Sequence, residues 1–345
     1  MKLLTALFCV MSLAAFAQPK FGIEKKDSCY KRGEAKSKQR FAEWECGKIA
    51  GVVDCNEKLE LDPGSNTVIT SGNKQPFSGM CETCHMNGIL ERRVTFVNGK
   101  TNGIDTTNYK SGCPMVIRSH IQGVENGKWT YFNDSTGIPA WEKNYSMGQL
   151  HGSQVTYSRK GDTLRWENYN NGVLQGPKVT YNVKGIRTKQ VTYVNGLLDG
   201  PFLVYNAEGK IIEETSYKEG KKNGVFRYYY DDGTLLRTEN WLNGQKNGEF
   251  KMLYYDQSLQ SMEIYKKDLK EGWFEERFPN GKSRRRAFYK KDVLIEEHVF
   301  DEQGTEIKTF GGQASNGKED DEMPAKGGKP KKEKKPKKEK KKKGE

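Results

Sequence analysis

The sequence predicts an all-β protein, an elongated and twisted single antiparallel sheet of about ten consecutive β-hairpin repeats, each about 24 residues long. Three observations predict this fold. Glycines recur at a fixed step, aromatic residues recur at two fixed offsets between them, and short segments rich in Val, Thr and Tyr alternate apolar with polar residues. Helix is excluded because glycine interrupts every window long enough to form an amphipathic helix.

A column of glycines defines the repeat. The step between neighbouring glycines is constant, except that one step is a single residue longer than the others. The array, predicted over residues 78–310, is marked by Gly79, Gly103, Gly127, Gly152, Gly176, Gly200, Gly224, Gly248 and Gly272. Two strands per repeat at ~4.8 Å spacing give about 10 Å per repeat, so the sheet should be long and thin.

Two aromatic columns run through these repeats, one five residues and one seventeen residues after the glycine. Period-two alternation, as in Val155 and Tyr157, places apolar side chains of a strand on one face. We expect both columns to share that face and to form a candidate binding surface, since exposed apolar patches mark interaction sites. The alternative is that these rings simply pack as core. The candidate face comprises Tyr157, Tyr169, Tyr181, Tyr193, Tyr205, Tyr217, Tyr229 and Trp241.

The two connections of each repeat carry different glycine patterns. Pairs such as Asp232-Gly233 suit tight hairpin turns. The segment from Asn171 to Gly176 is expected to be a five-residue loop. Asp268 and Asp292 replace the loop glycine, and the segment 256–258 lacks the turn glycine. We therefore expect less regular late repeats, with aspartate in the left-handed conformation.

Residues 76–310 resemble MORN repeats through the pattern of Tyr205, Gly209, Tyr217, Gly220 and Gly224, which neighbouring units share. The likeness is specifically to the bacterial variant labelled YwqK-like antitoxin component. It implies a β-hairpin array, and it implies an antitoxin-like binding module as one function.

The segments flanking the array differ in composition. Residues 1–17 are typical of a secretory signal peptide, with a charged start, an apolar core and a small-x-small cleavage site. Residues 18–77 are interpreted as a cysteine-containing cap that closes the sheet edge. Residues 311–345 are predicted to be a disordered linker and tail. Residues 326–345 hold twelve Lys and three Glu, a net +9 of the chain's +13.

Six cysteines remain after the signal peptide, all in the first third of the chain. An even number in an exported chain predicts disulfides, and six cysteines allow fifteen pairings. The candidates are Cys29, Cys46, Cys55, Cys81, Cys84 and Cys113. Cys81 and Cys84 lie on one predicted strand and point to opposite faces, which disfavours a bond between them.

The segment from Cys81 through Cys84 to His85 also matches C-x-x-C-H, the signature of c-type haem attachment. A zinc-like or other metal site is a further alternative for this spacing. The other histidines have no metal-pair spacing, and His120 falls in the second aromatic column, where packing is its expected role.

No catalytic motif of the common hydrolase, nucleotide-binding or metalloprotease types occurs. We expect a non-enzymatic, exported repeat protein without cofactor or lipid anchor, in the periplasm or outside the cell. Its surface would bind a protein, glycan or membrane partner. The lysine-rich tail would bind an anionic membrane or lipopolysaccharide, and nucleic acid is not an expected partner in vivo.

Overall fold

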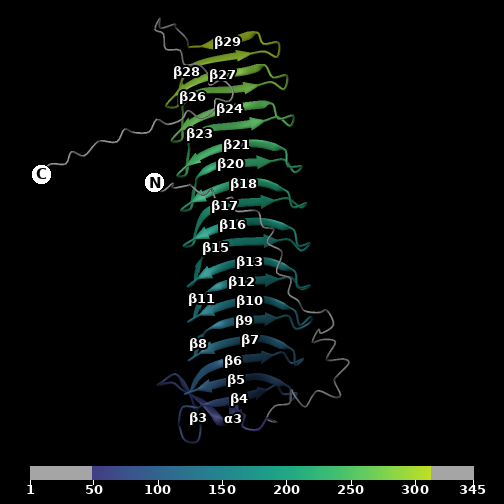
Figure 1. Ribbon diagram of the computed structural model, residues 1–345, viewed down its shortest axis with the longest axis vertical. Helices are drawn as coiled ribbons and strands as arrows, with labels where there is room; N and C mark the ends of the chain where they lie inside the picture. Colours follow the sequence, from purple (N-terminus) through teal and green to yellow (C-terminus); the bar gives the residue numbers. More distant parts are fainter. Residues whose placement is uncertain (1–48, 312–345) are drawn as a thin grey trace, which may run out of the picture.

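The computed structural model describes residues 49–311. The predicted signal peptide, the cap residues before Ile49 and the predicted lysine-rich tail lie outside the described residues. Within them the protein is a single long open sheet of 27 strands, together with a two-stranded sheet in the cap. Figure 1 shows the strands stacked one above another along the longest axis of the molecule.

The strands follow one another in the sheet in sequence order, so each repeat pairs with its neighbours. All pairings are antiparallel except that of β1 with β4, which is parallel. The predicted single antiparallel sheet is therefore confirmed, with this one parallel edge. The elements are β1 (Val53–Asp54), α3 (Cys55–Lys58), β2 (Leu59–Asp62), β3 (Thr67–Thr70), β4 (Gly79–Cys84), β5 (Leu90–Val97), β6 (Lys100–Asn108), β7 (Pro114–Ile121), β8 (Val124–Glu125), β9 (Gly127–Phe132), β10 (Pro139–Ser146), β11 (Gln149–Leu150), β12 (Gly152–Tyr157), β13 (Thr163–Asn170), β14 (Val173–Leu174), β15 (Gly176–Tyr181), β16 (Arg187–Val194), β17 (Leu197–Tyr205), β18 (Ile211–Lys218), β19 (Lys221–Lys222), β20 (Gly224–Tyr229), β21 (Leu235–Leu242), β22 (Gln245–Lys246), β23 (Gly248–Leu253), β24 (Leu259–Lys266), β25 (Leu269–Lys270), β26 (Gly272–Arg277), β27 (Ser283–Lys290), β28 (Val293–Phe300) and β29 (Glu306–Phe310).

The tight turn and the wider loop of each repeat occur at the opposite connections from those expected from the sequence. Asn171 and Gly172 both have positive φ, 46° and 80°, and the flanking residues Asn170 and Val173 pair directly. Two consecutive left-handed residues form the tight turn that matches strand twist, so the predicted five-residue loop is wrong. The connection between β20 and β21 is the wider one, with only Gly233 at positive φ.

Each wide connection begins at a β-bulge that also fixes its width. Between β12 and β13, Thr156 pairs with Arg165 while Tyr157 pairs with Thr163, so one residue of β13 is extra. The amide of Gly161 donates to the carbonyl of Ser158 at 3.0 Å. A bulge of this kind bends the strand locally and increases its twist.

The late repeats keep the regular geometry, contrary to expectation. Asp268 and Asp292 occupy the second turn position with φ of 69° and 67°, and Gln257 has φ 68°. Left-handed aspartate is thus confirmed, but strand lengths and register match those of earlier repeats. The side chains of Asp268 and Asp292 accept hydrogen bonds from the amides of Lys246 and Lys270 at 2.7 and 2.6 Å, which offsets the cost of the conformation.

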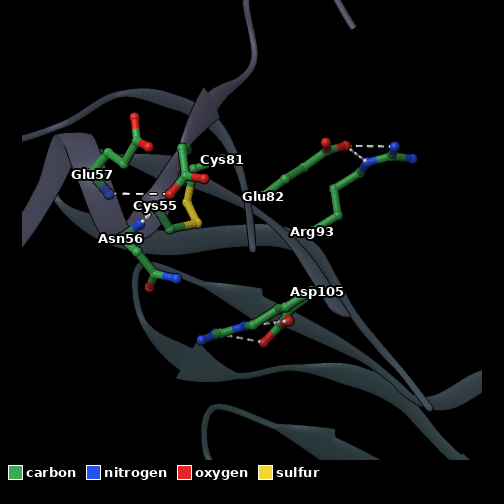
Figure 2. The surroundings of a disulfide bond; sticks show 9 residues. Cys55, Asn56, Glu57, Cys81, Glu82, Arg93 and Asp105 are labelled. Carbon is green, nitrogen blue, oxygen red and sulfur yellow. Dashed lines mark hydrogen bonds and ion pairs between the residues drawn. A yellow bond between two sulfur atoms is a disulfide. The ribbon is translucent and has the colours of Figure 1, made fainter. Parts of the chain in front are cut away.

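The cap closes the first edge of the sheet. The disulfide Cys55–Cys81 joins α3 to β4, and the parallel bridge of Val53 to Cys81 lies beside it. Figure 2 shows this junction. The short helix α3 was not expected from sequence. The side chain of Asp54 caps it by accepting from the amides of Asn56 and Glu57 at 2.8 and 3.1 Å.

Candidate binding surfaces

The two predicted aromatic columns lie on opposite sides of the sheet. Residues paired directly across antiparallel strands point to the same side. Tyr169 pairs with Gly152, whereas Val155 pairs with Trp166 and so points the other way, together with Tyr157 two residues later. The single aromatic face expected from sequence is therefore wrong. We call the side of Tyr169 side A and that of Tyr157 side B.

Side A carries a continuous row of eight rings over the last repeats. Neighbouring ring centroids in this aromatic row are 4.8–6.0 Å apart. The row contains Phe202, Tyr217, Phe226, Trp241, Phe250, Tyr265, Phe274 and Tyr289. Contacts at this spacing contribute beyond area burial alone, so the row ties each repeat to the next.

Lysines cover the aromatic row. The ammonium groups of Lys222, Lys246 and Lys270 each lie 4.2–5.2 Å from the centroids of two rings. Beneath them Phe226 is fully buried and Phe274 is 4% exposed. The row is thus core covered by lysine stems rather than an open groove.

Side B carries Tyr157, Tyr181, Tyr205 and Tyr229, at the other end of the strands. The Tyr157 hydroxyl donates to Glu142 at 3.0 Å, and the Tyr229 hydroxyl donates to Glu214 at 3.1 Å. Burial and the neighbouring carboxylate raise the pKa of both phenols above the ordinary value. None of the eight predicted face residues is exposed: Tyr157 is buried and the other seven are half-buried.

The tight turns form a ladder of hydrogen bonds between repeats, which was not predicted from the sequence. At seven of the nine repeat glycines, the preceding residue places a side-chain oxygen on the amide of the first turn residue one repeat later. Asn102, Asn126 and Asn223 accept in this way from Gln122, Met147 and Asn243 at 3.1–3.3 Å. The sequence did contain a signal for this ladder, because a residue with a side-chain oxygen precedes every glycine of the column except Gly152.

A row of exposed apolar side chains lies along the edge formed by these tight turns. Side chains on either side of the turn stack at one-repeat intervals. An added Cβ at Gly148 or Gly196 would lie 3.3 Å from Val124 or Val173 of the preceding repeat. This turn-edge ridge comprises Ile121, Val124, Met147, Val173, Val194 and Leu197, which are 37–67% exposed. Lys218 and Lys221 interrupt it at the next repeat.

The C-x-x-C-H segment follows the repeat geometry. Cys81 lies on side A at the position that phenylalanine takes in later repeats, and it is bonded to Cys55. Cys84 is also disulfide-bonded. The His85 ring lies 3.0 Å from the Asn108 carbonyl, in the same way that the Tyr109 hydroxyl reaches the Phe132 carbonyl at 2.8 Å.

Sulfurs held in disulfides offer no thiol for haem attachment and no thiolate for a metal. Among residues 49–311, no group of three or more His, Cys, Asp or Glu side chains is placed to hold a metal ion. In its oxidised form this segment therefore provides one strand and one inter-repeat contact of the array.

The first two repeats contain buried carboxylates that pair with arginine. Asp105 is 1% exposed on side A and takes the position of the phenylalanine column. Arg92 contacts both of its oxygens at 3.0 Å, and Arg118 approaches at 2.7 Å. On side B, Glu82 accepts from Arg93 at 2.6 Å (Figure 2). Removing one partner of such a pair strongly destabilises a protein, because it leaves a buried charge without compensation.

The remaining histidines have separate environments. His120 packs against Trp129 with ring centroids 5.4 Å apart, which confirms its expected packing role. Burial lowers the pKa of His120. His151 is exposed before β12. His298 lies between two glutamates near the end of the sheet.

Comparisons with known proteins do not place this chain in a family. No family model matches the sequence, and no curated protein matches it. A search of solved structures returns a Photorhabdus luminescens Tc holotoxin pore, with 9% sequence identity and a TM-score of 0.15. The match covers 72% of this chain and 16% of that one. No helix among the described residues is long and apolar enough to cross a membrane.

Proposed function

We propose that this protein is an exported, non-enzymatic scaffold whose array binds a partner protein along the turn-edge ridge. The observation that carries the proposal is the ridge itself. Six large apolar side chains are exposed at four successive tight turns, whereas the eight rings of the aromatic row are buried or half-buried. Contiguous exposed apolar patches on a protein surface mark interaction sites.

Four features support an exported scaffold. The Cys55–Cys81 disulfide suits an oxidising compartment. The predicted signal peptide would deliver the chain there, and the predicted lysine-rich tail would hold it at an anionic envelope surface. The open array offers a long side that a partner can follow over several repeats.

The proposal is tested by photo-crosslinking in cells with a genetically encoded crosslinker at single sites. Val173 lies on the ridge, and Val183, 76% exposed, lies at the opposite edge and is the matched control. We expect a discrete protein adduct from position 173 and none from position 183. Equal adducts at both positions, or none at position 173, would contradict the proposal.

An antitoxin-like module, which the MORN resemblance implies, would use the same surface. The identity of the crosslinked protein distinguishes it, because a toxin-like partner would have to be met outside the cytoplasm.

A further inference from the structure

We propose that His298 is a proton-operated latch on β29, the strand that ends the described sheet. With its ring doubly protonated, His298 holds β29 against β28, and loss of one ring proton loosens that strand. This inference is independent of the turn-edge ridge and of any partner.

The geometry requires both ring nitrogens to donate. Nδ1 of His298 lies 2.5 Å from Oε1 of Glu306 on β29, and Nε2 lies 2.6 Å from Oε1 of Glu296 on β28. An ionised carboxylate only accepts hydrogen bonds, and a neutral imidazole has only one N–H. Both contacts can be hydrogen bonds only while the ring is an imidazolium, and deprotonation leaves a lone pair facing one carboxylate.

The other groups facing His298 do not replace this contact. Thr309, opposite on β29, donates its hydroxyl to the same Glu306 oxygen at 2.5 Å. Arg286, opposite on β27, lies with its guanidinium over the Trp273 ring at 5.0 Å.

Two further charged pairs are already formed nearby. Glu275, beside Arg286 on β26, is held by Arg277 at 3.1 Å. Lys308 on β29 pairs with Glu297 at 3.1 Å. On side B, the polar side-chain contact that joins β28 and β29 is therefore the one made by His298.

The strand that the latch holds is the one best placed to open. All five residues of β29 are exposed, and β28 is its only neighbour among the described strands. Strands with few buried contacts open at low free energy, so one contact shifts their opening equilibrium measurably. Opening would leave the eight-residue β28 as the end of the sheet.

The direction of the pH response follows from the two carboxylates. Hydrogen bonds to Glu296 and then Glu306 raise the pKa of His298 above its ordinary value. Hydrogen bonds from Thr309 and then His298 lower the pKa of Glu306, which stays ionised. A raised folded-state pKa means that the stabilisation is complete below the unfolded-state value. It is lost as pH rises through the folded-state value.

Amide hydrogen exchange of β29 across the histidine range, followed by NMR, tests the latch. Protection factors corrected for intrinsic exchange should fall roughly fivefold as pH rises, the effect of one partly exposed ion pair. The midpoint should coincide with titration of the His298 ring. His298→Gln should give the lower protection at every pH, while His151→Gln, at an exposed histidine, should keep the wild-type profile.

A second variant separates the latch from general fraying. Glu306→Gln keeps the side-chain shape and removes one carboxylate charge, so the His298 titration should move to lower pH. A flat wild-type profile, an unchanged profile in His298→Gln, or an unmoved titration in Glu306→Gln would each overturn the proposal.

Discussion

At the residue scale, Asp105 is a buried charge whose loss should destabilise the protein. It is buried between Arg92 and Arg118, so Asp105→Ala leaves two guanidinium groups without their partner. Because both arginines are partly exposed, we expect a loss of about 2 kcal/mol in the free energy of unfolding, below the value for a fully buried pair. Chemical denaturation measures it.

Asp134→Ala is the control for that substitution, because Asp134 is exposed and accepts a hydrogen bond from the Ser111 hydroxyl rather than from an arginine pair. Its unfolding midpoint should stay close to the wild type. A loss as large as that of Asp105→Ala would show that the ion pairs with Arg92 and Arg118 are not what makes Asp105 important.

His85 provides a second test at this scale. His85→Leu removes the contact of the ring with the Asn108 carbonyl and should destabilise the array by about 1 kcal/mol. His151→Leu, at an exposed site, should not. The oxidised protein should show no Soret absorbance, and a Soret band in the wild type that disappears in His85→Leu would restore the haem hypothesis.

At the element scale, the loss of stability when a turn glycine is replaced by alanine should depend on the atoms that an added Cβ would contact. Gly172 has φ 80° and open space where a Cβ would sit, whereas a Cβ at Gly99 would lie 2.6 Å from the Val68 carbonyl oxygen. Gly172→Ala should cost about 1 kcal/mol through the left-handed conformation alone. Gly99→Ala should cost about 2 kcal/mol more, because the cap must shift.

Thermal unfolding of the two glycine variants checks this difference. Equal losses would mean that the contact between the first tight turn and the cap contributes nothing.

The sequence predicts the elements of the array themselves, but it does not predict the side of the sheet on which each side chain lies. The repeat, the hairpins and the left-handed Asp268 follow from composition and spacing. The side on which a ring points does not, because it depends on the number of residues in the connection. The bulge beside Tyr157 changes that number by one, and a slip of one residue reverses every side chain.

The turn types were hidden for a similar reason. Both connections contain a residue followed by glycine, and only the direct pairing of Asn170 with Val173 shows which turn is tight. Helix α3 had a readable signal, since Asp54 precedes Glu57 by three residues as at many helix starts. The Cys55–Cys81 pairing had none, because sequence does not rank fifteen pairings.

At the scale of the whole molecule, the array should tolerate removal of a complete repeat. Deleting residues 201–224 removes one full period and rejoins equivalent positions, so each strand keeps its neighbours and its sides. The shortened protein should fold and lose ~10 Å of length by small-angle scattering. Deleting residues 201–212 removes half of the period, including the end of β17 and the first two residues of β18, and it should abolish cooperative unfolding. Similar behaviour of both deletions would contradict the repeat length that the glycine column defines.

Residues 79–310 form one open ladder in which every repeat adds the same rise. Pulsed electron resonance between encoded spin labels at tight turns tests it most directly, with one label at Asn171 and the second at Glu219, Asn243 or Lys267. The distance should grow by about 10 Å for each added repeat. A distance that stops growing, or that shortens for the most distant pair, would contradict the open ladder.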